Sequence, residues 1–176
     1  MVDENSNIKT FPGSGSTPPS RTMPNNLQAE QNLLGAILLD NSVLERIDDR
    51  LLADHFYDPS HGRIFSTMQR LVERGQLANP VTLKSFFTDS DDFQSDGAES
   101  YLSELADGVI SITQAPDYAK IIHEAHVRRQ LVLIGDEVIL DASHPEVDVP
   151  AHQQIETAES KLFRLADTDS TSVGLR

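Results

Sequence analysis

The sequence predicts an all-α protein, a compact helical head followed by a long antiparallel helical hairpin. Three observations predict this fold class. Every proline after residue 22 lies where a helix should begin or end, apolar residues recur at helical spacing, and no run alternates with the period of two expected for a strand. We therefore expect a tail at 1–22, a head at 23–112, a long helix and hairpin at 113–166, and the beginning of a linker at 167–176.

The tail and the overall composition exclude several classes of protein. Residues 1–22 are rich in Gly, Ser, Thr and Pro and hold too few apolar side chains to form a core, so we expect them to be disordered. They lack the apolar run of a signal peptide, and no aliphatic run in the chain is long enough to cross a bilayer. The absence of cysteine excludes disulfides and thiolate catalysis. We expect a soluble, cytoplasmic protein with no membrane contact.

The formal net charge of −14 bears directly on partners. Nucleic-acid binding draws most of its non-specific affinity from cations that displace counterions at phosphates. A surface of this charge should repel DNA, so we expect no direct DNA binding. Residues 85–119 contain no Lys or Arg and eight acidic residues. We interpret them mainly as a solvated acidic face, with docking of a basic partner as the alternative.

The first helix of the head has a clear start signal. Asn25 or Asn26 can accept a hydrogen bond from the free amides of the first turn, and Gln28 follows Asn25 at the spacing of a capping box. The apolar stripe that we expect to be buried consists of Leu27, Leu34, Ile37 and Leu38.

The next two helices also have boundary signals. Ser42 and Glu45 have the spacing of a capping box for a short second helix with inward-facing Val43, Leu44 and Ile47. The sequence Asp58-Pro59-Ser60 should open a third helix, which Gly75 should close. Its expected core residues are Ile64, Phe65, Met68, Leu71 and Val72.

Two further helices complete the expected head. Thr82 should cap a fourth helix that continues through Phe86 and Phe87, and an acidic loop should follow over 88–97. The fifth helix is marked by Tyr101, Leu102 and Leu105 and should end at Gly108.

The segment from 117 to 142 contains no proline and would form a helix about 39 Å long. In its first half we expect one apolar side, facing the head, made of Tyr118, Ile121, Ile122 and Ala125. In its second half Val132 and Ile139 lie roughly opposite a stripe made of Val127, Leu131, Ile134 and Val138. A helix that is apolar on two sides needs two neighbours.

One of those neighbours should come from the chain itself. His144-Pro145 should stop the long helix, and Pro150 should open another that holds Ile155, Ala158, Leu162 and Leu165. We expect the two helices to form an antiparallel hairpin. The head is already used by the first half of the long helix, so the remaining stripe should be covered by a second subunit in a twofold dimer.

Several ordered motifs carry a resemblance to a known family. They are Asn26-Leu27-Gln28-Ala29-Glu30-Gln31, the run from Leu33 to Leu39, the block from His55 to Phe65, Val81-Thr82-Leu83, and the run from Tyr101 to Ala106. In this order they resemble the N-terminal domain of bacterial DnaB-type replicative DNA helicases, from about residue 23 to about residue 166.

The resemblance implies an assembly and docking role. In that family, hairpins pair two N-terminal domains, and three pairs form the N-terminal collar of a hexameric ring on which the C-terminal domain of the primase docks. A helicase loader is a further candidate partner. The candidate residues for the dimer or partner interface are Val127, Arg128, Leu131, Ile134, Val138, Ile155 and Leu162.

The resemblance also implies that catalysis lies elsewhere. The family's motor is an ATP-dependent 5′–3′ helicase domain that follows the N-terminal domain after a linker. No glycine in this sequence is followed by lysine, so the phosphate-binding loop of such a motor is missing. We expect no catalytic or cofactor-binding residues here, with ATP and Mg bound by the motor, and interpret the chain as a truncated N-terminal part of the helicase.

Two alternatives stay open at this point. The helicase-binding C-terminal domain of a bacterial primase has a related helical fold and a similar leucine-rich first helix, although the block from Phe56 to His61 argues against it. A small metal-dependent helical hydrolase would use His123, His126 and nearby carboxylates. Their spacing of three is not that of zinc proteases and no third ligand is evident, so we expect solvated histidines and no metal site.

The other polar motifs have ordinary structural interpretations. His61 should form a hydrogen bond near a helix start rather than act as a base. The aspartate pairs at 48–49 and 91–92 should stay solvated. For Arg128-Arg129 we favour pairing with Glu124, four residues earlier, over a polar rim around an interface.

Overall fold

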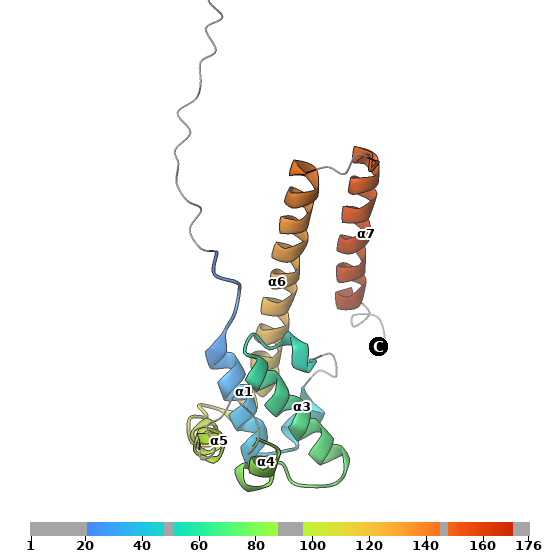
Figure 1. The fold of residues 1–176 in the computed structure, drawn as a ribbon. Coiled ribbons are helices and arrows are strands. Elements are labelled where there is room, and N and C mark those ends of the chain that lie inside the picture. Colours follow the sequence, from blue (N-terminus) through green and yellow to red (C-terminus); the bar gives the residue numbers. More distant parts are fainter. Residues whose placement is uncertain (1–20, 48–50, 88–96, 145–147, 171–176) are drawn as a thin grey trace, which may run out of the picture.

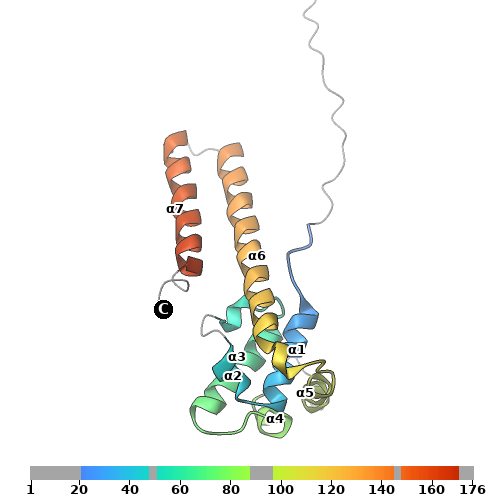
Figure 2. The ribbon, with the colours of Figure 1, turned by 180° about the vertical axis from the view of Figure 1, so that it is seen from behind.

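The computed structural model describes residues 21–47, 51–87, 97–144 and 148–170, and all regular structure within these ranges is helical. The elements, in chain order, are α1 (Leu27–Leu39), α2 (Val43–Arg46), the 3-10 helix η1 (Ala53–His55), α3 (Pro59–Glu73), α4 (Pro80–Phe87), α5 (Gly97–Asp107), the 3-10 helix η2 (Ile112–Gln114), α6 (Ala115–Ser143) and α7 (Ala151–Ser170). The expected all-α fold with a head and a projecting hairpin is confirmed (Figures 1 and 2).

Some predictions fall on residues outside the described ranges. They concern the tail up to residue 20, the two aspartate pairs, the acidic loop over 88–96, Pro145, and the last six residues.

Helix α1 begins at the second of the two candidate caps. The Oδ1 atom of Asn26 accepts a hydrogen bond from the Ala29 amide at 3.0 Å, whereas the Asn25 side chain donates to the Met23 carbonyl. With Asn26 as the cap, the third helical position is Ala29, whose side chain has no acceptor. The expected capping box with Gln28 therefore does not form.

Helix α1 is the centre of the head and contacts α3, α5 and α6. Of the expected stripe, Leu34, Ile37 and Leu38 are buried, but Leu27 is 41% exposed, so that prediction was wrong. The burial extends beyond one stripe to Leu33, Ala36, Glu30 and Asn32. A helix surrounded by three others buries polar positions as well, and Asn32 accepts a hydrogen bond from the Ile110 amide at 3.1 Å.

The second helix starts differently from the prediction. Ser42 makes no capping hydrogen bond; both its amide and its hydroxyl donate to Oδ1 of Asp40, at 3.0 and 2.6 Å. The turn is thus organised by a carboxylate two residues earlier. The inward positions hold, since Val43 and Ile47 are buried and Leu44 packs against the core.

Helix α3 has the predicted ends. Asp58 accepts a hydrogen bond from the Ser60 amide at 2.8 Å, and Pro59 occupies the first helical position. At the other end Gly75 has a φ of 72°, and the Gln76 amide reaches back to the Leu71 carbonyl at 2.9 Å. This left-handed C-terminal arrangement is the one that glycine favours. The expected core residues Ile64, Phe65, Met68 and Leu71 are buried.

Helix α4 is capped three residues before the predicted position. Asn79 Oδ1 accepts from the Thr82 amide at 2.9 Å, and Thr82 Oγ1 accepts from the Asn79 amide at 3.0 Å. Asn79 is therefore the cap and Thr82 its reciprocal partner. In α5, Leu102 and Leu105 are buried and the helix ends before Gly108, as predicted.

Helix α6 is continuous from the head to the tip of the hairpin. It begins two residues earlier than predicted because Pro116 fits the first turn. Ala119, Ile122 and Ala125 are buried against the head, whereas Ile121 is 40% exposed, contrary to the prediction. Helix α7 runs antiparallel beside the second half of α6 (Figure 1). Contacts between the two helices include the Lys161–Glu137 ion pair at 2.5 Å.

Candidate interaction surface

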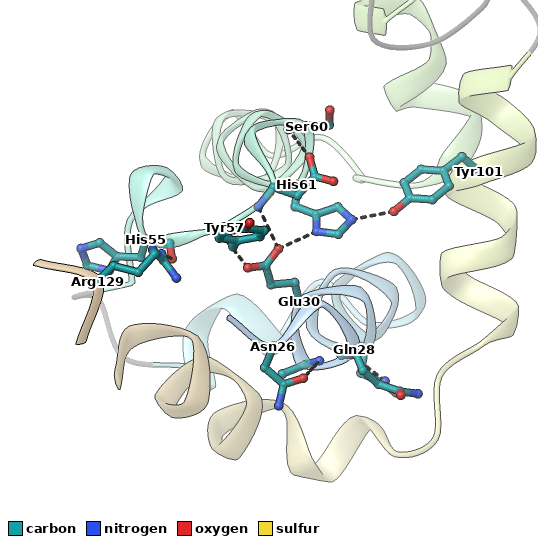
Figure 3. Close-up of polar contacts among 12 residues, drawn as sticks. Asn26, Gln28, Glu30, His55, Tyr57, Ser60, His61, Tyr101 and Arg129 are labelled. Carbon is teal, nitrogen blue, oxygen red and sulfur yellow. Dashed lines mark hydrogen bonds and ion pairs between the residues drawn. The ribbon is translucent and has the colours of Figure 1, made fainter. Parts of the chain in front are cut away.

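A buried polar network joins residues from three of the sequence motifs that carry the family resemblance. Glu30 on α1 accepts hydrogen bonds from the backbone amides of Tyr57 and Asp58, at 2.6 and 3.3 Å. Its Oε2 atom lies 2.6 Å from Nδ1 of His61 on α3, and Nε2 of His61 lies 2.5 Å from the Tyr101 hydroxyl on α5 (Figure 3). One chain of hydrogen bonds thus connects three helices of the head.

The chemistry of the groups fixes the direction of these hydrogen bonds. An ionised carboxylate only accepts, so Nδ1 of His61 donates to Glu30. In the neutral imidazole Nε2 then accepts from the Tyr101 hydroxyl. Burial raises the pKa of Tyr101, which keeps that hydroxyl protonated as a donor. The side chains of Glu30 and His61 are both 2% exposed, so no substrate reaches them. The network holds the head together, and the prediction that His61 bonds near a helix start is confirmed.

Arg129 fastens the base of the hairpin to the head. Its guanidinium donates to the Pro24 carbonyl at 2.8 Å and to the His55 carbonyl at 2.6 Å, and lies 5.7 Å from the centre of the Tyr57 ring. The sequence did not predict this role, because every residue has a backbone carbonyl and the residue type does not show which carbonyl will accept. Arg128 behaves as the favoured interpretation expected and pairs with Glu124 at 2.9 Å.

The two histidines of α6 pack on a third one. The rings of His123 and His126 lie 5.1 and 4.2 Å, centre to centre, from the ring of His55 on η1. Both are half-buried, which corrects the expectation of solvated histidines. Burial, and then the charge of His126, lower the pKa of His55 to about 4. Within the described ranges no group of three or more His, Asp or Glu side chains is arranged to hold a metal ion.

The predicted interface residues lie on the hairpin. Leu131 and Val138 on α6 are 47% and 40% exposed, and Ile155 and Leu162 on α7 are 60% and 45% exposed. Within each pair the spacing is seven residues, or two turns, which places both members on one side of their helix. Of the remaining candidates, Val127 and Ile134 are half-buried and Arg128 is exposed.

Two polar contacts show which sides of α6 and α7 face each other in the hairpin. Besides the Lys161–Glu137 pair, the Gln154 side chain donates to the Asp141 carbonyl at 2.9 Å. These contacts place the two helices side by side. Helical spacing puts Leu131 and Val138 about a third of a turn from Glu137 on α6, and Ile155 and Leu162 about a third of a turn from Lys161 on α7. Leu140 and Phe163 are 60% and 72% exposed, and sequence reasoning missed them. By helical spacing Leu140 lies about half a turn from Leu131 on α6, and Phe163 lies about 100° from Leu162 on α7. The described helices include none that is long and apolar enough to cross a membrane.

Comparisons with known proteins agree on one family. The family model described as the DnaB-like helicase N-terminal domain matches residues 22–124. The chain is 39% identical over 149 residues to the replicative DNA helicase DnaB of Rickettsia felis, covering 85% of this chain and 30% of that protein. It is 34% identical over 131 residues to DnaB of Geobacillus stearothermophilus, covering 73% of this chain and 29% of that protein. The chain thus spans about 30% of the length of these curated relatives.

Solved structures show the same likeness. The N-terminal domain of DnaB helicase from Mycobacterium tuberculosis superposes with a TM-score of 0.68 at 26% identity, covering 81% of this chain and 99% of that one. A DnaB-like replicative helicase, whose structure was described together with its interactions with primase, gives a TM-score of 0.62 at 26% identity. That match covers 80% of this chain and 31% of the other.

Proposed function

This chain belongs to the DnaB-like helicase N-terminal domain family, and from that premise we propose that it is the assembly and partner-docking domain of a hexameric replicative DNA helicase. Its proposed tasks are to dimerise through the hairpin and to bind primase. The membership also decides against the helicase-binding domain of a primase as the identity of the chain.

The observation that carries the proposal is the uncovered apolar face of the hairpin. Leu131, Val138, Ile155 and Leu162 are each at least 40% exposed. The seven-residue spacing within each pair places its two members on one side of their helix. A second copy related by a twofold axis would present the same four residues and bury both sets. We propose that three such dimers form a ring, and that the remaining length of the relatives corresponds to the ATP-dependent 5′–3′ motor, which holds ATP and Mg.

The dimer is tested by sedimentation of the wild type beside charged variants. Leu131→Asp and Leu162→Asp place a carboxylate in the proposed interface, and loss of an interface hot spot of about 2 kcal/mol weakens dimerisation roughly thirtyfold. Matched controls are Leu140→Asp and Phe163→Asp, which add the same charge to exposed apolar positions. These positions lie about half a turn from Leu131 on α6 and about 100° from Leu162 on α7. A wild type that stays monomeric at high micromolar concentration, or equal weakening by the controls, contradicts the dimer.

Primase binding is supported by the likeness to the helicase described with its interactions with primase. The test is a calorimetric titration with the C-terminal domain of the cognate primase, using the wild type and the Leu131→Asp monomer. Saturable binding to the wild type is expected. Binding that survives in the monomer assigns docking to the surface of one subunit away from Leu131, whereas its loss assigns docking to the hairpin face that carries Leu131, in the dimer or in one subunit. No binding to the wild type removes the primase role and leaves the dimer proposal standing. A helicase loader is a further proposed partner, tested in the same way.

A further inference from the structure

A small pocket lies between α3 and α4, formed by residues with no part in the buried network or the hairpin. It has a volume of about 30 Å³ and is lined by Thr67, Arg70, Leu71, Arg74 and Phe86. Thr67, Arg70 and Leu71 lie in the last two turns of α3, Arg74 is the residue that caps the end of this helix, and Phe86 comes from α4. The pocket is large enough for the end of one aliphatic side chain.

The apolar part of the pocket combines a buried residue with an exposed ring. Leu71 is 4% exposed, so it belongs to the core, whereas Phe86 is 52% exposed. The neighbouring ring of Phe87 is 4% exposed, as expected for the inward side of α4. The Phe86 ring is therefore not required by the core. Aromatic residues and arginine are both enriched at protein interfaces.

The two cations of the pocket differ from five other cations in the described ranges. In the described ranges, several Lys and Arg side chains form ion pairs with carboxylates, namely Arg21, Arg46, Lys84, Arg128 and Lys161. Arg70 instead donates to the Ser66 carbonyl at 3.3 Å and to the Thr67 hydroxyl at 3.2 Å, both on its own helix. Among the described residues no carboxylate pairs with Arg70 or Arg74. The chain has 28 acidic residues against 14 basic ones, so two adjacent cations without such partners stand out.

The position of these arginines has an ordinary explanation that covers only part of the observation. Cations near a helix C-terminus interact favourably with the helix dipole, and α3 ends at Glu73. That effect accounts for a cation at this end of the helix. It accounts neither for the pocket between the two side chains nor for the exposed Phe86 ring.

We propose that this pocket docks an acidic peptide segment of a partner protein. One aliphatic side chain of the segment lies over Leu71 and Phe86, and its carboxylates pair with the guanidinium groups of Arg70 and Arg74. Guanidinium groups match carboxylates in a bidentate geometry. A single-stranded nucleic acid fits less well, because two cations replace few of its counterions.

The test uses a fluorescein-labelled, amidated heptapeptide, Asp-Glu-Asp-Leu-Asp-Glu-Asp, and fluorescence anisotropy with the full chain at physiological salt. Saturable binding is expected, with at least tenfold weaker binding when the peptide leucine is replaced by glycine. Arg74→Glu and Phe86→Ser should each weaken binding at least tenfold. Two matched controls should change it less than twofold. Lys120→Glu makes the same charge change at an exposed position on α6, and Val81→Ser removes an apolar side chain that is 73% exposed on α4.

Three outcomes overturn the proposal. The first is no saturable binding of the peptide below about 1 mM. The second is equal weakening by Arg74→Glu and Lys120→Glu, which indicates attraction by overall charge. The third is tighter binding of a labelled oligothymidine than of the peptide, with the same dependence on Arg74 and Phe86, which assigns the pocket to nucleic acid. Circular dichroism of every variant establishes that each is folded.

Discussion

At the scale of single residues, the head depends on a carboxylate placed where solvent does not reach. Glu30 is 1% exposed and accepts hydrogen bonds from two backbone amides at the start of α3 and from His61. The amino end of a helix favours a negative charge. The carboxylate is therefore stabilised only when α1 and α3 pack together. Its hydrogen bonds contribute to the stability of the tertiary structure and not to that of either helix alone.

Substitution of His61 should show how much the stability of the head depends on the Glu30 hydrogen bonds. His61→Ala leaves the Glu30 carboxylate buried without its side-chain partner and creates a cavity, and we expect the free energy of unfolding to fall by about 3–5 kcal/mol. Tyr101→Phe removes one hydrogen bond and should cost about 1 kcal/mol. Urea unfolding followed by circular dichroism measures both. His152→Ala, at an exposed position on α7, is the control and should change stability by less than about 0.5 kcal/mol. Equal effects at positions 61 and 152 would contradict the role of the network.

The lowered pKa of His55 predicts a loss of stability in mild acid. The folded protein keeps His55 neutral down to about pH 4, whereas the unfolded chain takes up its proton near pH 6.5. Between these values the unfolded state binds more protons, so the free energy of unfolding decreases as the pH falls through this window. The expected loss is about 2 kcal/mol at pH 5 relative to pH 7. The lowered pKa of His126 acts in the same direction.

A variant isolates this contribution from those of the carboxylates. In His55→Gln the difference in unfolding free energy between pH 7 and pH 5 should be smaller than in the wild type by about 2 kcal/mol. The NMR titration of the wild-type His55 ring should have a midpoint near 4. A midpoint near 6.5 would show that the ring is solvated and would remove the prediction.

At the scale of helices, the crossing of α1 and α5 depends on one glycine. A Cβ atom at Gly35 would collide with the Leu105 backbone carbonyl and come within 2.5 Å of the Val109 side chain, whereas one at Gly135 on α6 would meet nothing within 4 Å. We therefore expect Gly35→Ala to lower the melting temperature, with a cost of at least about 3 kcal/mol because backbone must move. Gly135→Ala should raise stability by about 0.5–1 kcal/mol through helix propensity. Calorimetry of the pair would refute the crossing geometry if both substitutions stabilised.

Local signals in the sequence predicted the positions of helices better than they predicted which side chains are buried and which groups they contact. The ends of α3 follow from Asp58-Pro59 and Gly75, because both ends are set by residues in contact with the helix itself. The cap of α4 was misplaced because Asn79 and Thr82 cap each other, and either residue type is a good cap alone. The burial of Glu30 was missed because its partners come from 27 or more residues away.

The candidate interaction surface was predictable to the same extent. The hairpin and its stripe follow from helical periodicity in α6 and α7, which is local information. The Arg129 contacts with the Pro24 and His55 carbonyls do not, because any residue offers a carbonyl and only the fold selects these two. The exposed rings of Phe86 and Phe163 look like core residues in the sequence, since exposure is a property of the assembled chain.

At the scale of the whole molecule, the proposed dimer ties stability to protein concentration. A partner that binds only the folded chain stabilises it by mass action. The melting temperature should rise by roughly 5 °C between about 2 and about 200 µM of the wild type. For Leu131→Asp it should be independent of concentration. Scanning calorimetry at the two concentrations measures this difference. If the melting temperature of the wild type is the same at both, the hairpin does not mediate a dimer.

The continuity of α6 makes the hairpin a lever arm. Its residues 115–129 contact the head, and the same helix continues to Ser143 with no proline after its first turn. About 21 Å of helix therefore projects beyond the head, and a tilt of about 10° at the base would move the tip by about 4 Å. A small rotation of the head would therefore produce a larger displacement at the hairpin tip, where the chain passes from α6 to α7. A partner bound at that tip, as proposed above, would then receive a mechanical displacement from the head.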